Sequence, residues 1–201
     1  MLTSRRRSRG FNLIELMVTI SVLALLLGLA VPAASDWLHN TQVRSVAEAI
    51  QNGMQKARAE AIRRNRPVGF WLVTPVSGVP DSTCAASSSS PSWVISLDNP
   101  AGKCDVAASP TVAPRTVEVF GSKWSGINVA ALAADGVTVA SSITFNSFGQ
   151  PVPGTTPIGL INISHQQSGA RRLRIELSSG GAVRLCDRDA SSPDPRACQL
   201  P

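Results

Sequence analysis

The chain has 201 residues, a formal net charge of +6 and a pI near 9.9, which suits one ordinary domain with an appended segment. Four of its nineteen Lys and Arg residues lie in the first ten positions, so the rest carries fifteen basic and thirteen acidic residues. This balance excludes overall basicity as an argument for nucleic-acid binding, which would need a local basic cluster.

A short basic segment precedes a long apolar one at the N-terminus. Residues 1–10 read MLTSRRRSRG, and residues 11–31 contain a single ionisable side chain, Glu15. An apolar run of this length spans a bilayer as a helix, and the arginines before it keep the leader in the cytoplasm. Two other interpretations are a secretory signal peptide, cleaved near Val31-Pro32-Ala33, and a plain single-span anchor.

Glu15 argues against both of those interpretations. A carboxylate near the start of an apolar helix is costly in lipid, and neither a disposable signal nor a simple anchor needs one. If the chain begins at Phe11, Glu15 is its fifth residue. In a bundle of identical helices it would then meet the N-terminal amine of a neighbouring copy, which predicts a role in assembly.

The sequence Gly10-Phe11-Asn12-Leu13-Ile14-Glu15-Leu16 resembles the class III signal of type IV pilins and pseudopilins, G|F-T-L-I-E-L. Asn12 replaces the commoner threonine. The resemblance implies that a prepilin peptidase removes the leader 1–10 by cutting after Gly10 and methylates Phe11. It also implies that Glu15 is the assembly glutamate. The implied partners are other pilins or pseudopilins of the filament and the inner-membrane assembly platform.

The helical pattern continues beyond the membrane-spanning and filament-core segment 11–32 into an amphipathic segment, 33–66. Gly28 and Pro32 predict a kink between the two, since proline removes a backbone hydrogen bond. Asn65 and Pro67 predict the helix end. The apolar stripe of the second segment recurs at spacings near three and four and contains Trp37, Leu38, Val43, Val46, Ala47, Ile50, Met54, Ala57, Ala61 and Ile62.

Residues 67–201 change to a period near two, which predicts a β-rich globular domain. The stretch 75–92, with its run of serines, is expected to be a flexible loop. The fold class is therefore α+β and pilin-like, with a long N-terminal helix packed on about seven short antiparallel strands. The predicted strands are 67–74, 92–98, 115–120, 142–146, 157–164, 171–177 and 181–186.

Four cysteines allow three disulfide pairings. The local pairs Cys84–Cys104 and Cys186–Cys198 are favoured, because each closes a stretch rich in Pro, Ser or Asp that is unlikely to order itself. Disulfides imply an oxidising compartment such as a bacterial periplasm. The alternative is four reduced, buried thiols. A zinc site is poorly supported, since no CxxC pair occurs and both histidines are far from a cysteine cluster.

Several features resemble the GspH/FimT family of minor pseudopilins and minor pilins. They are the helix end at 57–65, the strand from Trp93 to Asp98, the segment 143–149, and the final hairpin that ends in Arg184 and Cys186. The resemblance implies a single-pass inner-membrane protein with its C-terminal head in the periplasm, which later joins a pilus or pseudopilus.

No catalytic constellation, phosphate loop or metal-binding motif is present, so we predict neither an enzyme nor a cofactor. A DNA-binding hypothesis rests on a local arginine cluster, because arginines grip the phosphates of a duplex. FimT-type relatives are implicated in DNA uptake through Gly-Arg-x-Arg at this hairpin, and here the motif reads Gly181-Ala182-Val183-Arg184. The alternative is a solvated face paired with nearby aspartates. The cluster contains Arg171, Arg172, Arg174, Arg184, Arg188 and Arg196.

Three functions therefore remain open. The first is a minor pilin that is the initiation or tip subunit of a type IV pilus, with a structural and assembly role. The second is a pseudopilin that binds double-stranded DNA for natural transformation. The third is the H-type pseudopilin of type II protein secretion. A major pilin is a weaker fourth hypothesis, because such subunits usually carry a single C-terminal disulfide loop.

Overall fold

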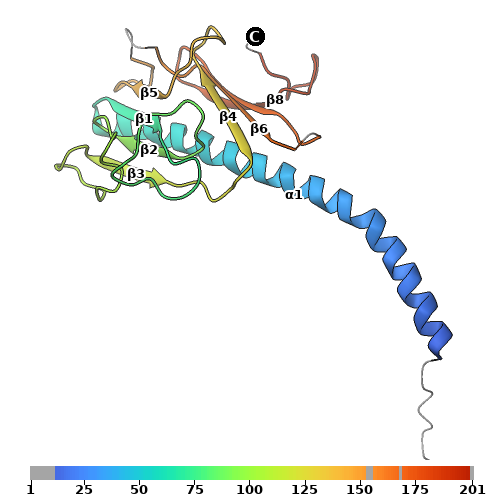
Figure 1. Cartoon of the computed structure of the whole chain (residues 1–201). Coiled ribbons are helices and arrows are strands. Elements are labelled where there is room, and N and C mark those ends of the chain that lie inside the picture. Colours follow the sequence, from blue (N-terminus) through green and yellow to red (C-terminus); the bar gives the residue numbers. More distant parts are fainter. Residues whose placement is uncertain (1–11, 153–155, 168, 200–201) are drawn as a thin grey trace, which may run out of the picture. The chain divides into compact units, whose positions relative to one another are not determined.

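The computed structural model describes residues 12–152, 156–167 and 169–199, without the side chains of residues 29–34 (Figure 1). The predicted cleavage site, Gly10 and Phe11, lies outside the described residues. The chain divides into two compact units, one ending at Leu38 and the other beginning at His39. We describe each unit by itself and call the second one the head.

Helix α1 (Leu13–Arg64) runs through both units and remains helical at Gly28 and Pro32, where a kink stays a prediction. Glu15 stands in its first turn, where a negative charge suits the positive end of the helix dipole. Among the described residues, we find no helix with both the length and the apolarity needed to cross a membrane. The predicted segment 11–32 also contains a residue and side chains outside that description.

The helix ends as the sequence predicts. Asn65 adopts a positive φ of 50°, and the Arg66 N–H donates to the Ala61 carbonyl at 3.2 Å. Asparagine tolerates the left-handed conformation that commonly ends a helix, and Pro67 then prevents its continuation. Arg63 and Arg64 occupy the last turn, where cations favour the negative end of the dipole.

The head contains two four-stranded sheets in which every pairing is antiparallel. The first sheet has the order β3-β2-β1-β5 and the second the order β4-β6-β7-β8. The strands are β1 (Val68–Leu72), β2 (Trp93–Ser96), β3 (Thr116–Phe120), β4 (Ile127–Leu132), β5 (Ser142–Phe145), β6 (Leu160–His165), β7 (Leu173–Leu177) and β8 (Val183–Asp187).

The α+β prediction is confirmed, but the prediction of seven strands omitted β4. Ile127, Val129 and Ala131 are buried in alternation with exposed Asn128 and Ala130, so the period of two is present. Alanine and asparagine have low β propensity, which hid the pattern. β4 forms because six residues pair with β6, from Ile127 opposite His165 to Leu132 opposite Leu160.

The core of the head lies between one face of α1 and both sheets. The buried helix positions are Val43, Val46, Ala47, Ile50, Met54, Ala57 and Ala61, each at most 1% exposed. The predicted stripe was too long at both ends. Trp37, Leu38 and Ile62 are at least half exposed, so helical spacing alone did not mark where packing begins and stops.

The stretch 75–92 contains no named strand, but it is tied to the head by hydrogen bonds. Ser90 and Ser92 are fully buried. The Ser90 hydroxyl donates to the Pro75 carbonyl at 3.2 Å, and the Ser92 hydroxyl accepts from the Ser122 N–H at 3.1 Å. Two of its serines therefore serve as core polar groups with satisfied hydrogen bonds, rather than as residues of the flexible loop that was predicted.

Candidate functional site

The first half of α1, Leu13–Gly28, presents apolar side chains to solvent all around. We call it the apolar segment. Each of its large apolar side chains is more than half exposed, and Leu13 reaches 74%. An apolar surface of this size calls for lipid or another protein to cover it. The exposed residues are Leu13, Ile14, Leu16, Met17, Val18, Ile20, Val22, Leu23, Leu25, Leu26 and Leu27.

Polar groups within the apolar segment are satisfied by the helix itself, with one exception. The Thr19 hydroxyl donates to the Leu16 carbonyl at 2.9 Å, and the Ser21 hydroxyl donates to the Met17 carbonyl at 2.8 Å. Such bonds hide a hydroxyl from an apolar solvent. Glu15 is exposed and forms no ion pair with any described residue. It is therefore the one group of this segment that needs a polar partner from outside.

The six predicted DNA-binding arginines lie on or beside β7, β8 and the C-terminal loop, and two of them form exposed ion pairs. Arg172 Nε lies 2.8 Å from Asp189 Oδ1, and Arg196 Nη2 lies 2.7 Å from Asp194 Oδ2. Hydrogen bonds from the Arg196 side chain and backbone lower the pKa of Asp194 to about 2. These two arginines thus match the alternative of a solvated face paired with aspartates.

Two further arginines have structural contacts. Arg184 Nη2 donates to the carbonyls of Pro195 and Ala197 at 2.8 and 2.9 Å, which fixes the C-terminal loop beside β8. Arg174 is 8% exposed, and its Nε donates to Asn162 Oδ1 at 2.9 Å. Neither guanidinium is presented freely to a ligand.

Arg171 and Arg188 are exposed and form no ion pair within the described part of the chain. Partial burial of its guanidinium, and then the neighbouring Arg174 and Arg172, lower the pKa of Arg188, and the one opposing group, the Asp189 carboxylate, does not outweigh them. The cluster is therefore positive around Arg188. Sequence reasoning treated the six arginines alike, whereas the structure separates two available ones from four that have partners.

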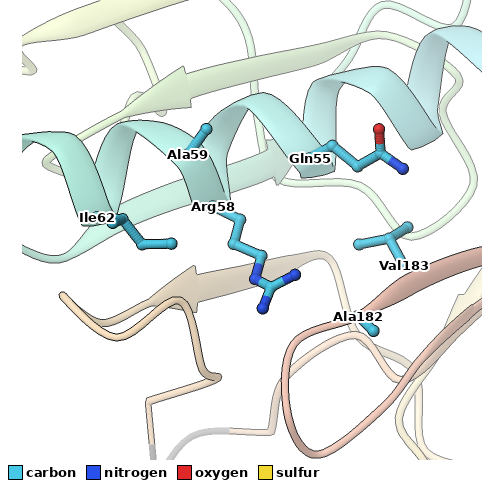
Figure 2. Close-up of a pocket in the computed structure, with 6 residues that line it drawn as sticks. All are labelled: Gln55, Arg58, Ala59, Ile62, Ala182 and Val183. Atoms are coloured by element: carbon cyan, nitrogen blue, oxygen red, sulfur yellow. The ribbon is translucent and has the colours of Figure 1, made fainter.

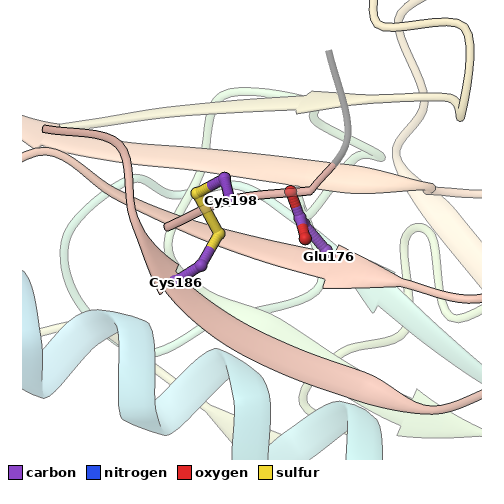
Figure 3. A group of neighbouring side chains, drawn as sticks. All are labelled: Glu176, Cys186 and Cys198. Atoms are coloured by element: carbon purple, nitrogen blue, oxygen red, sulfur yellow. A yellow bond between two sulfur atoms is a disulfide. The ribbon is translucent and has the colours of Figure 1, made fainter. Parts of the chain in front are cut away.

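The structure pairs Cys84 with Cys104 and Cys186 with Cys198, the two local pairings that the sequence favoured. Figure 3 shows Glu176 beside the second disulfide. Both sulfurs are bonded to each other and offer no thiolate to a metal ion. The Glu176 carboxylate instead accepts the Gln199 N–H at 3.0 and 3.1 Å, so this group anchors the C-terminal segment on the sheet.

Arg58 is a structural residue that the sequence analysis missed. From α1 its Nε donates to the Gly149 carbonyl at 2.9 Å, and Nη2 lies 3.4 Å from the Gly180 carbonyl. Gly149 and Gly181 both have positive φ, and a Cβ on Gly181 would lie 2.0 Å from the Gly149 oxygen. We call this contact the Arg58 clasp. The sequence held one signal of this contact. Arg58 and Gly149 lie within the segments 57–65 and 143–149, which resemble the GspH/FimT family, and Gly180 adjoins the third such segment, 181–186.

A pocket of about 440 Å³ lies beside the clasp. Figure 2 shows Arg58 extending from the helix toward the turns, with Ala182 and Val183 across from Gln55. Its walls are mainly apolar, from Ala59, Ile62, Ala182 and Val183. Because the guanidinium already bonds to two carbonyls, the pocket offers shape and apolar surface rather than a reactive group.

Two family descriptions match the chain. The family described as "Type II transport protein GspH" matches residues 46–181, which is more than half of the chain. The "Prokaryotic N-terminal methylation motif" matches residues 5–31. The first match covers α1 from Val46 onward and β1 to β7, and the second covers residues 5–10 of the leader and the apolar segment.

Individual relatives match a shorter part. Residues of the chain are 37% identical over 70 positions to the "Pilin-like protein PilA1" of Thermus thermophilus, covering 35% of this chain and 44% of that protein. They are 26% identical over 91 positions to the "Type IV major fimbrial protein FimA" of Dichelobacter nodosus, covering 38% and 56%. The chain thus spans about half the length of the curated relatives it matches.

Among solved structures, the chain resembles the type IV minor pilin FimU of Pseudomonas aeruginosa in two crystal forms. The first match has 18% sequence identity and a TM-score of 0.49, covering 79% of this chain and 96% of that one. The second also has 18% identity, with a TM-score of 0.46.

Proposed function

The chain belongs to the GspH family of type II transport proteins. From this premise we propose that it is a minor pilin-like subunit that initiates assembly of a type IV pilus filament or lies at the filament tip. Its role is structural and concerns assembly. The observation that carries the proposal is the apolar segment, whose exposed side chains need a cover and whose Glu15 needs a partner. A filament core of identical helices supplies both.

In this proposal a prepilin peptidase cuts after Gly10 and methylates Phe11. The residues 11–32 anchor the chain in the inner membrane, with the head in the periplasm, until an assembly platform moves the chain into the filament. The positive N-terminus of the incoming chain then neutralises Glu15 of a neighbour, because an unpaired carboxylate is costly in an apolar surrounding. Residues 33–66 carry the helix into the β-rich domain, 67–201.

Mass spectrometry of the chain's N-terminus tests the first step. Methylated Phe11 is the expected result, and a Gly10→Ala variant should keep the leader. A mature chain that begins near Ala34 would instead identify a secretory signal, and the membrane and filament proposals would both be wrong. Co-purification with pilus fractions or with secretion pseudopilus fractions then separates the type IV pilus from the H-type pseudopilin of type II secretion.

A second candidate function is capture of double-stranded DNA during uptake. The observation in its favour is the positive region around Arg188, with Arg171 also exposed and without an ion pair among the described residues. Phosphate contacts of this kind supply sequence-independent affinity that weakens steeply with salt. The Arg184 of the imperfect Gly-Ala-Val-Arg motif is occupied by backbone carbonyls, so it is not the residue we expect to bind.

A salt series of duplex binding by the full chain in detergent tests this candidate. DNA capture predicts that Arg171→Gln with Arg188→Gln lowers affinity and reduces the salt slope by about 2, one for each phosphate contact. Arg44→Gln is the matched control, since it removes a cation from the helix and should leave binding unchanged. Equal binding, or none, by all three proteins would leave the assembly role alone.

A further inference from the structure

The two histidines of the chain, His39 and His165, are stacked on each other in the head. Their ring centroids lie 4.2 Å apart with an interplanar angle of 17°. His39 is the first residue of the head along α1, and His165 is the last residue of β6. Because they are 126 positions apart in sequence, their contact joins the helix to the second sheet.

The hydrogen bonds around His165 require an unprotonated ring. The Gln167 N–H donates to Nδ1 of His165 at 3.0 Å, so that nitrogen acts as an acceptor and the neutral ring carries its proton on Nε2. Gly126 lies against the Nε2 side of the His165 ring, since a Cβ added at Gly126 would be 3.1 Å from Nε2. A second proton, on Nδ1, would remove this acceptor and break the hydrogen bond from Gln167.

Charge compensation is also missing. Charged residues on the elements around the pair are Asp36, Arg44 and Glu48 on α1, Lys123 before β4, Arg171 after β6, Arg174 and Glu176 on β7, and Arg184 and Asp187 on β8. Within the described residues neither imidazole forms an ion pair with any of them, and Arg44 is engaged by Glu48 at 2.7 Å. Burial and the neighbouring His39 lower the pKa of His165 below its ordinary 6.5.

Next to the pair, a hydrogen bond also joins the first helical turn of the head to the residues after β6. The Arg171 N–H donates to Asn40 Oδ1 at 2.7 Å. The next helix position that is fully buried in the core is Val43. His39 and Asn40 therefore form a separate attachment of the first helical turn of the head, ahead of the apolar core.

We propose that the stacked His39–His165 pair is a pH-sensitive latch that holds the first helical turn of the head on the second sheet and releases it in acid. At neutral pH the His165 ring accepts the Gln167 N–H and stacks on His39. As the pH falls below 6.5, the released His165 ring binds a proton more readily than the stacked one, so the equilibrium moves toward release. The apolar core beginning at Val43 stays packed, so release is local.

Hydrogen exchange of the full chain in detergent tests the latch. We expect the protection of amides 39–43 and 165–167, corrected for intrinsic exchange rates, to fall several-fold from pH 7.5 to pH 5, because the pKa of His165 is lower in the stacked state than in the released one. His165→Phe keeps an aromatic ring beside His39 but cannot accept a proton, so the protection that this variant has at pH 7.5 should be largely kept at pH 5. Glu48→Gln is the control for a general charge effect and should behave as the unaltered chain.

Proton NMR of the imidazole C–H signals provides a second measurement that needs no variant, because the chain has only these two histidines. At least one midpoint should lie below 6.5. Two midpoints at or above 6.5 would overturn the proposal. So would protection that is independent of pH, or a fall at pH 5 that is equally large in His165→Phe.

Discussion

The two halves of helix α1 treat their apolar side chains in opposite ways. In the apolar segment Leu13–Gly28 they are exposed on every side, and Leu23 is 56% exposed. In the head they form one stripe, and Ile50 and Met54 are completely buried. One continuous helix thus has two kinds of surroundings, the packed core of the head around its second half and the exterior of the chain around its first half. Its second half finds its apolar surroundings within the chain, and its first half must find them outside.

This difference shows which contacts each half needs for stability. A buried stripe gains free energy from packing in the folded monomer, so its contribution appears in the unfolding of the head. The apolar segment gains nothing comparable within the described chain. Its side chains, and Glu15 above all, are expected to affect anchoring and assembly instead of folding.

The largest effect is expected from Glu15. Replacing it by Leu removes the one charge of the apolar segment and, with it, the pairing with an incoming N-terminus. A loss of about 1.4 kcal/mol in docking lowers the affinity about tenfold. Removing one partner of an ion pair buried in apolar surroundings costs more than that, because the other charge is left uncompensated. We therefore expect the amount of the Glu15→Leu chain in sheared filament fractions, measured by immunoblot, to be at least about tenfold lower than that of the unaltered chain.

The control for this prediction is Glu48→Gln, which removes an exposed carboxylate from the second half of the helix. It should leave filament incorporation unchanged. If Glu15→Leu chains entered filaments as well as the unaltered chain, the apolar segment would be a plain anchor, and the functional difference between the two halves would disappear.

Ile50→Ala should produce the next largest effect, on the head. Ile50 is fully buried in the core cluster between the helix and the sheets, and truncation of such a side chain costs about 2–5 kcal/mol. Chemical denaturation followed by tryptophan fluorescence measures the free energy of unfolding. Leu23→Ala is the matched variant in the apolar segment and should leave that free energy unchanged. Equal losses in both variants would contradict the comparison.

Much of this comparison was accessible from the sequence. In the first half, apolar residues without a period predict a helix that is apolar on all sides. In the second half, apolar residues at spacings of three and four predict a helix with one buried stripe. The helix end at Asn65 and Pro67 also followed from local chemistry, because these residues restrict the backbone by themselves. Seven strands and the local disulfide pairs followed from alternation and from loop composition in the same way.

The sequence did not predict the features that depend on contacts between residues far apart in the chain. Ile62 continues the helical spacing, but it lies beside the pocket and is half exposed. β4 has weak local propensity and depends on pairing with β6. Arg58 looks like any solvated helix residue, yet its partner Gly149 is 91 positions away. No periodicity records such a contact, so the sequence could not predict it.

Arg58→Met tests whether an apparently solvated position of the second half stabilises the head. The substitution keeps much of the side-chain length but removes the bond from Nε to the Gly149 carbonyl. A hydrogen bond from a charged group is worth about 1.5–3 kcal/mol, so we expect a loss in unfolding free energy of that size. Arg63→Met is the control, because among the described residues Arg63 pairs with Glu60 of its own helix and with no other. A loss no larger than the control's would mean that the clasp adds nothing.

The smallest effect is expected from Arg44→Gln. Arg44 and Glu48 form an exposed pair one turn apart, and such pairs contribute about 0.5 kcal/mol or less, falling further with salt. Denaturation at low and high salt should therefore show a small loss that vanishes as salt rises. A loss that persists in high salt would show that the exposed face of the second half also stabilises the head. The exposed and buried faces of this half would then differ less in energy than their accessibility indicates.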